Sequence, residues 1–141
     1  LRDNNMLNNN NFTIMSVDQF PIITMQVFPE TLEHANNWIA EMDLVLAQKQ
    51  NFVLVYPPIN KKNEQEDMEG MKAVRRWLKT GKMPLSQYCA GMIMTVNQQT
   101  NDKEQLMQLS PVVSAVYGVP IFVEETLDGA YAQANKLLSN K

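Results

Sequence analysis

The stretch Phe52-Val53-Leu54-Val55-Tyr56, followed at once by Pro57-Pro58, decides the fold of this chain. Five consecutive apolar residues are typical of a short strand, and the two prolines end it. Because successive side chains of a strand point to opposite faces, a strand that is apolar at every position must be buried on both faces. The stretch therefore predicts a central strand in a sheet that is covered by helices.

Similar strand signals lie on both sides of this stretch. Residues 91–96 and 119–123 are also apolar runs, and residues 12–17 and 22–28 are rich in strand-forming side chains. The short polar segment 18–21 between the first two runs predicts an opening strand pair, either a hairpin or a meander, with one strand at the edge of the sheet.

A first amphipathic helix is predicted after Thr31, which is a good N-cap residue. Its apolar positions step by three and four residues, which places them on one helical face. Acidic residues fall elsewhere on the wheel and predict an acidic outer face. The apolar face comprises Leu32, Ala35, Ile39, Met42 and Leu46, flanked by Trp38 and Val45, and the acidic residues are Glu33, Glu41 and Asp43.

Three further helical regions follow. Met71, Val74 and Leu78 define the apolar face of a second helix that we expect to stop at Gly81, before a short helix over residues 84–89. Asp102 and Thr126 have the right chemistry for the N-caps of two later helices. Within the first of these, Ser110-Pro111 predicts a restart, and Gly118 predicts the end.

The predicted order is β-β-α-β-α-β-α-β-α, which is typical of an α/β fold. We expect a single domain in which a sheet of about four or five mixed strands is covered by about four helices. The domain is predicted over residues 12–141. Residues 1–11, which contain six asparagines, are predicted to be a disordered leader or a remnant of cloning or processing.

Composition narrows the classes of function. The 141 residues, 45% hydrophobic and 19% charged, suit one folded domain. The formal net charge of −3 argues against nucleic-acid binding. One cysteine, Cys89, and one histidine, His34, exclude an internal disulfide and a multi-histidine metal site, and no metal or cofactor is expected. No apolar run approaches the length of a membrane span, so we predict a cytoplasmic protein.

The chain resembles a STAS-type domain, the fold of anti-sigma-factor antagonists, and in particular its single-domain bacterial members of unassigned function. The resemblance covers roughly residues 12–138. It rests on Trp38-Ile39-Ala40-Glu41-Met42-Asp43, Phe52-Val53-Leu54-Val55-Tyr56, Arg76-Trp77-Leu78, Cys89-Ala90-Gly91-Met92 and the final strand and helix over residues 119–138. It implies a regulatory module that binds other proteins.

One departure from that family concerns its regulation. The regulatory members carry a phosphorylated Ser or Thr before the second helix, whereas the corresponding residues 60–70 here contain neither. Phosphorylation at that place is therefore excluded, and partner switching by the usual mechanism is not expected.

A basic helix face is the sharpest charge feature of the sequence. Five basic residues of the second helix fall within an arc of about 120°, opposite its apolar side. We interpret this as a candidate interaction face for an acidic protein, a nucleotide or a lipid head group, with an ordinary solvated face as the alternative. The five residues are Lys72, Arg75, Arg76, Lys79 and Lys82.

A candidate ligand edge is formed by Tyr56, Pro57 and Pro58, because ligands of open α/β sheets bind beyond the carboxyl ends of the strands. The ten methionines are expected to fill the core, with a pocket for a small apolar ligand as the alternative. Met92 and Met94 share a strand face, and Met42, Met71 and Met107 are expected at core or flanking positions of helices.

We therefore predict a non-enzymatic interaction or regulatory module that binds a protein partner or itself. An apolar-ligand binding or sensing protein is the first alternative. A metal-independent carboxylate enzyme is the second, using the acidic cluster Glu64, Glu66, Asp67 and Glu69, for which solvent exposure is the simpler explanation. No catalytic residue is assigned, since Cys89 lacks a neighbouring base in the sequence.

Overall fold

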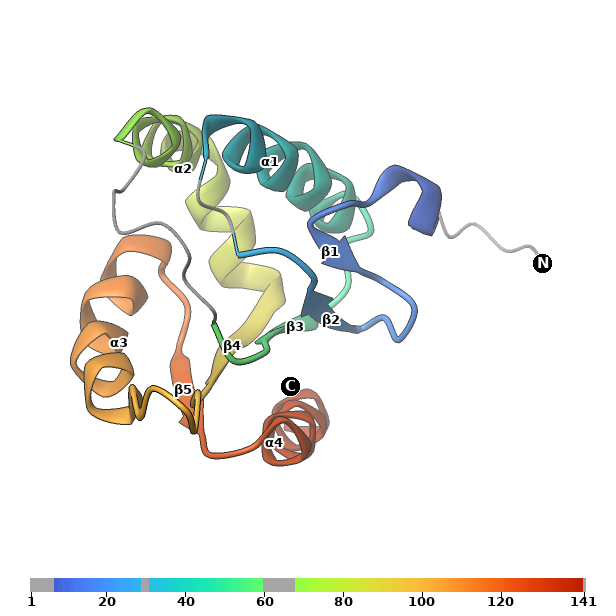
Figure 1. The fold of residues 1–141 in the computed structure, drawn as a ribbon. Helices are drawn as coiled ribbons and strands as arrows, with labels where there is room; N and C mark the ends of the chain where they lie inside the picture. Colours follow the sequence, from blue (N-terminus) through green and yellow to red (C-terminus); the bar gives the residue numbers. More distant parts are fainter. Residues whose placement is uncertain (1–6, 29–30, 60–67, 141) are drawn as a thin grey trace.

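Five strands form one mixed sheet in the order β1-β2-β3-β4-β5 (Figure 1). In this computed structural model, which describes residues 7–28, 31–59 and 68–140, β3 (Phe52–Tyr56) and β4 (Cys89–Thr95) are central. They run parallel to each other and to β2 (Ile22–Met25) and β5 (Ile121–Glu124), while the two-residue β1 (Met15–Ser16) pairs antiparallel with β2. The predicted α/β class, element order and mixed sheet are confirmed.

Four helices cover the sheet (Figure 1). These are α1 (Leu32–Leu46), α2 (Met68–Tyr88), α3 (Lys103–Tyr117) and α4 (Leu127–Ser139). The parallel strands follow one another across the sheet in chain order, so right-handed crossovers place the three connecting helices on the same side. The last helix, α4, lies on the opposite side. Among the described residues, no helix is both long enough and apolar enough to cross a membrane.

The alternation along β3 divides the core into two layers. Phe52 and Leu54 face α1 and α2, whereas Val53 and Val55 face α4, and all four are fully buried. Small residues, Ala130 and Ala134, let α4 approach the sheet closely. The continuous apolar run thus packs on both faces, as its sequence predicts.

The predicted strand over residues 12–17 is only two residues long, because Glu41 takes most of its backbone donors. The Glu41 carboxylate accepts the N–H groups of Thr13, Ile14 and Met15 at 2.9–3.1 Å, as well as the Thr13 hydroxyl at 3.1 Å. The assignment of Glu41 to an acidic outer face was wrong, since it is 4% exposed. It links α1 to the outer edge of the sheet.

Residues 1–11 are predicted to be a disordered or cloning-derived leader, but residues 7–11 belong to the folded domain. Leu7 is buried against the α1 side of the core, and a 3-10 turn, Asn9–Asn11, connects it to Phe12, which is also buried. The apolar side chains at positions 7 and 12 account for the order of an otherwise polar segment. Residues 1–6 lie outside the described residues.

The predicted stop at Gly81 and the separate helix over residues 84–89 were also wrong, because α2 is continuous from Met68 to Tyr88 with Pro84 inside it. Gly81 serves packing instead. A β-carbon there would lie 2.5 Å from ring carbons of Trp77, so only glycine leaves room for the indole.

The remaining helix boundaries are partly as predicted. Thr31 and Thr126 are N-caps whose hydroxyls accept the N–H groups of His34 and Gly129 at 3.0 Å, and Gly118 ends α3 with φ +74°. The expected restart at Ser110-Pro111 does not occur. The Ser110 hydroxyl donates to the Leu106 carbonyl at 2.8 Å, so it bonds back onto a continuous α3 rather than capping a new helix.

Candidate functional site

The five predicted basic residues of α2 are all exposed, and they differ in how they are engaged. Lys72 forms an ion pair with Glu69 at 3.4 Å. The Lys82 ammonium donates to the Ala115 carbonyl at 2.9 Å and thereby joins α2 to the last turn of α3. Within the part of the chain that the structure describes, the side chains of Arg75, Arg76 and Lys79 have no hydrogen bond or ion pair. These three residues are the available cations of the basic face.

The basic face costs the free protein some stability. Like charges three or four residues apart on a helix repel each other by about 0.2–0.5 kcal/mol per pair. Lys79 has such neighbours in Arg75, Arg76 and Lys82. Negative charge from a partner would relieve this repulsion.

An apolar side chain lies on the same face. Met83 is 79% exposed and stands four residues after Lys79 and seven after Arg76, which places it on the same side of the helix. The face therefore combines cations with one flexible apolar side chain, as surfaces that bind amphipathic segments often do.

The structure separates the three residues of the predicted ligand edge. Tyr56 packs into the layer beneath α1 and α2, in the same core cluster as Trp38. Burial, and secondarily the neighbouring Tyr117 and Cys89, raise the pKa of Tyr56 well above its ordinary value. Tyr56 is therefore a neutral core residue.

The carboxyl ends of β3, β4 and β5 lack the strand arrangement at which ligand crevices of open α/β sheets form. Such crevices form where the strand order reverses, and here the order is sequential across the parallel strands. The buried amide of Asn97 fills this edge, donating to the Ile59 carbonyl at 3.0 Å and accepting the Gln99 N–H at 2.9 Å. Nearby, the Lys103 ammonium bonded to Glu125 lowers the pKa of that carboxyl.

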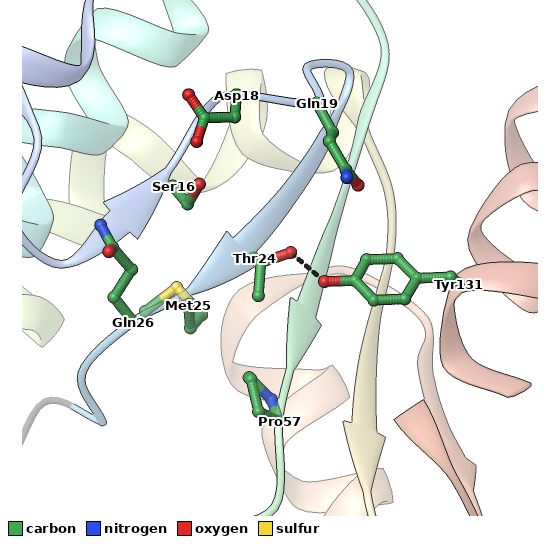
Figure 2. Close-up of a pocket in the computed structure, with 8 residues that line it drawn as sticks. All are labelled: Ser16, Asp18, Gln19, Thr24, Met25, Gln26, Pro57 and Tyr131. Carbon is green, nitrogen blue, oxygen red and sulfur yellow. Dashed lines mark hydrogen bonds between the residues drawn. The ribbon is translucent and has the colours of Figure 1, made fainter. Parts of the chain in front are cut away.

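An open pocket of about 500 Å³ lies on the α4 side of β1 and β2 (Figure 2). Pro57 is the one predicted edge residue that lines it. Six of its eight lining residues carry polar groups, and the Tyr131 ring extends from α4 so that its hydroxyl bonds to that of Thr24. The lining residues are Ser16, Asp18, Gln19, Thr24, Met25, Gln26, Pro57 and Tyr131. No basic side chain is among them, so the pocket does not suit an anion.

The methionines of the described residues differ widely in exposure. Met42 and Met92 are buried in the core as predicted, whereas Met71 and Met107 are 38% and 55% exposed, contrary to their expected positions. Met71 and Met107 lie on the solvent-facing sides of α2 and α3. Both positions are at the border of the apolar helix face, where the sequence pattern does not distinguish buried from exposed residues.

The thiol, the possible metal ligands and the acidic cluster do not come together in one site among the described residues. Cys89 is 1% exposed and its thiol donates to the Gly91 carbonyl at 3.4 Å. Over the described ranges, no three His, Cys, Asp or Glu side chains are grouped as a metal site requires. Of the acidic cluster, Glu69 is exposed beside Lys72, and Glu64, Glu66 and Asp67 lie outside the described residues.

The pocket residues of β1 and β2 and the contribution of Tyr131 from α4 were not predicted from the sequence. The pocket residues Ser16, Thr24 and Gln26 carry a weak signal, since polar side chains alternate with apolar ones where the sheet has an uncovered face. The contribution of Tyr131 depends on the placement of α4, for which no local signal exists. Comparisons with protein-family models, curated proteins and solved structures found no match to this chain.

Proposed function

We propose that the protein is a non-enzymatic interaction module that binds an acidic protein partner through the basic face of α2. The observation that carries this proposal is the exposure of Arg75, Arg76 and Lys79 without counter-ions among the described residues. The burial of Cys89, the only thiol, supports the absence of thiol chemistry.

The choice of a protein over a nucleic acid rests on charge. The chain has a net charge of −3, so its overall field repels a polyphosphate, and three free cations release few counterions. A protein segment with two or three carboxylates can pair with these cations at close range, and Met83 offers it an apolar contact.

A binding measurement with a labelled peptide tests the proposal. The probe is a short labelled peptide that contains Glu and Leu, and its binding is measured by fluorescence anisotropy at low salt. We expect the triple variant Arg75→Gln, Arg76→Gln, Lys79→Gln to lose at least about tenfold in affinity, since each charge pair contributes up to about 1 kcal/mol. Added salt should also weaken the binding of the peptide to the wild type, because it screens the charge pairs.

The matched control is the double variant Lys49→Gln, Lys136→Gln, which removes exposed cations outside α2. It should bind the peptide as the wild type does. Equal weakening per charge removed by the two sets of substitutions would mean that net charge alone governs binding, and the proposal would then be wrong. Failure of the wild type to bind would equally contradict it.

We also propose that the chain is a STAS-like regulatory domain. Its support is the agreement in element order, with an antiparallel first strand and a parallel remainder. In regulatory members the phosphorylated segment precedes the second helix, which corresponds here to α2 and its basic face. The relationship therefore predicts that substitutions on α2, rather than on α4, abolish partner binding.

The pocket at Tyr131 supports a second candidate function, the binding of a small polar ligand that is neutral or cationic. Its hydroxyl and amide groups can both donate and accept, and Asp18 adds a carboxylate. Amide NMR titration with glucose and with putrescine tests this function. Shifts confined to Ser16, Thr24 and the start of α4, and lost in Tyr131→Ala, are expected, and unchanged spectra with both probes would contradict it.

A further inference from the structure

The outer side of α3 differs from the exposed sides of the other helices. Residues 105–117 include no charged side chain, although most of this helix surface faces solvent. By contrast, α1 exposes Glu33 and Asp43, α2 exposes its bases, and α4 exposes Asp128 and Lys136. Uncharged, apolar stretches of this length on an exposed helix are typical of surfaces that another molecule covers.

Four residues of α3 form a continuous stripe, which we name the α3 seam: Gln105, Leu109, Val112 and Val116. They are spaced by four, three and four residues, so at 100° per residue they lie within an arc of about 60°. This is the spacing of the contact positions in paired helices. Leu109, Val112 and Val116 are 54%, 60% and 39% exposed, so the residues that the structure describes leave much of the seam uncovered.

We infer that the α3 seam binds the α3 seam of a second copy of this chain, in antiparallel orientation. The order of the spacings reads the same in both directions, so a two-fold axis between Leu109 and Val112 matches the stripe to itself. Leu109 then faces the second copy's Val112, and Gln105 faces the second copy's Val116. A seam without charge offers no attraction to a charged partner, which favours the self-pair.

The charges at the two ends of α3 are complementary in this arrangement. Glu104, exposed in the first turn, meets the last turn of the second copy's α3. That turn lies beside Lys82, whose side chain is 3.1 Å from an ideal β-carbon at Gly118. An antiparallel pair therefore places Glu104 near the second copy's Lys82 at both ends, whereas a parallel pair would bring identical charges together.

Sedimentation equilibrium and cysteine cross-linking test the inference together. The mass of the wild type should rise with concentration from 16.1 kDa toward twice that value. Leu109→Glu and Val112→Glu should each remain at 16.1 kDa, because a carboxylate would be buried at the axis. Ala132→Glu, on the exposed side of α4, is the matched control and should associate as the wild type does.

For cross-linking, the single variants Leu109→Cys and Val112→Cys are oxidised separately and as a mixture. The native Cys89 is buried and does not interfere. The mixture should form more disulfide dimer than either variant alone, because the two positions face each other across the axis. A wild type that stays monomeric, a dimer that persists in Leu109→Glu and Val112→Glu, or separate variants that cross-link as well as their mixture would overturn the inference.

The acidic-peptide assay reports on α2, and we expect these α3 variants to leave it unchanged. Either proposal can therefore fail while the other holds.

Discussion

Glu41 is the one buried charged residue among those that the structure describes. Its buried carboxylate satisfies three consecutive backbone N–H groups that would otherwise be unpaired at the edge of the sheet. Hydrogen bonds to a charged acceptor are stronger than neutral ones, and the desolvation of the carboxylate is offset by their number. One acidic side chain thus positions residues 13–15 against α1.

Replacing this acid by its amide should be destabilising. Glu41→Gln removes the charge and one acceptor oxygen, so we expect a loss of about 2–3 kcal/mol in the free energy of unfolding, measured by urea denaturation. The control Glu33→Gln, exposed on the same helix, should change stability by less than about 0.5 kcal/mol. Equal effects of the two substitutions would contradict the role assigned to Glu41.

Two tyrosines packed against the larger core cluster, Tyr56 of β3 and Tyr117 of α3, predict how stability depends on alkaline pH. Burial raises the pKa of both Tyr56 and Tyr117 above the ordinary value of 10.0. Below about pH 10 both states are protonated and the full stability is present. Above it the unfolded state loses protons first, so stability should fall by up to about 1.4 kcal/mol per pH unit for each tyrosine. Denaturation series at increasing pH measure this slope.

Tyr117→Phe provides the control for the alkaline series. Removal of one hydroxyl should make the decline in stability shallower above pH 10 and leave the slope below that pH unchanged. An identical slope in variant and wild type would show that other groups cause the alkaline loss.

At the scale of elements, α2 shows how a tertiary contact can override local signals. Gly81 and Pro84 both favour a helix end, yet the helix continues through them. The Trp77 indole covers Gly81, donates to the Asp43 carboxylate at 2.9 Å and packs edge-on against Trp38 with 5.4 Å between ring centroids. These contacts join α1 to α2, and they explain why the smallest residue stands at position 81.

A substitution at Gly81 tests this explanation. Alanine normally stabilises a helix interior by about 1 kcal/mol relative to glycine. Because its β-carbon would meet the Trp77 ring at 2.5–2.6 Å, we expect Gly81→Ala instead to destabilise by about 1–3 kcal/mol and to shift the tryptophan fluorescence. In a Trp77→Phe background the same change should cost less. Stabilisation by Gly81→Ala in the wild-type background would contradict the packing role.

At the scale of the whole molecule, the central strands belong to both core layers. Successive residues of β3 pack alternately into one layer and the other, so we expect the two layers to unfold together. Both tryptophans of the chain, Trp38 and Trp77, lie in the layer of α1 and α2, and α4 has none. Fluorescence therefore reports on one layer, and far-ultraviolet circular dichroism reports on all four helices.

The two signals should give coincident unfolding curves in urea, because the layers share β3 and β4. They should still coincide in Leu85→Ala, which opens a cavity under α2 and should cost about 2–5 kcal/mol. Separate midpoints, with α4 melting independently of the tryptophans, would contradict a single cooperative unit.

The local pattern of apolar and capping residues was sufficient for much of this structure. The run 52–56 predicted a strand buried on both faces, Thr31 and Thr126 predicted helix starts, and Gly118 predicted a helix end, because each depends on neighbours within one turn or one strand. The five bases of α2 could be placed on one exposed face for the same reason.

Contacts between distant segments required the tertiary structure. The burial of Glu41 depends on backbone groups 26–28 residues away, the continuity of α2 depends on an indole that packs over Gly81, and the pocket joins β1 and β2 to Tyr131 of α4. Side-chain periodicity shows which face of an element is apolar, but not which element will cover it. That choice is made by packing over the whole chain, and it decided which surfaces remained open for binding.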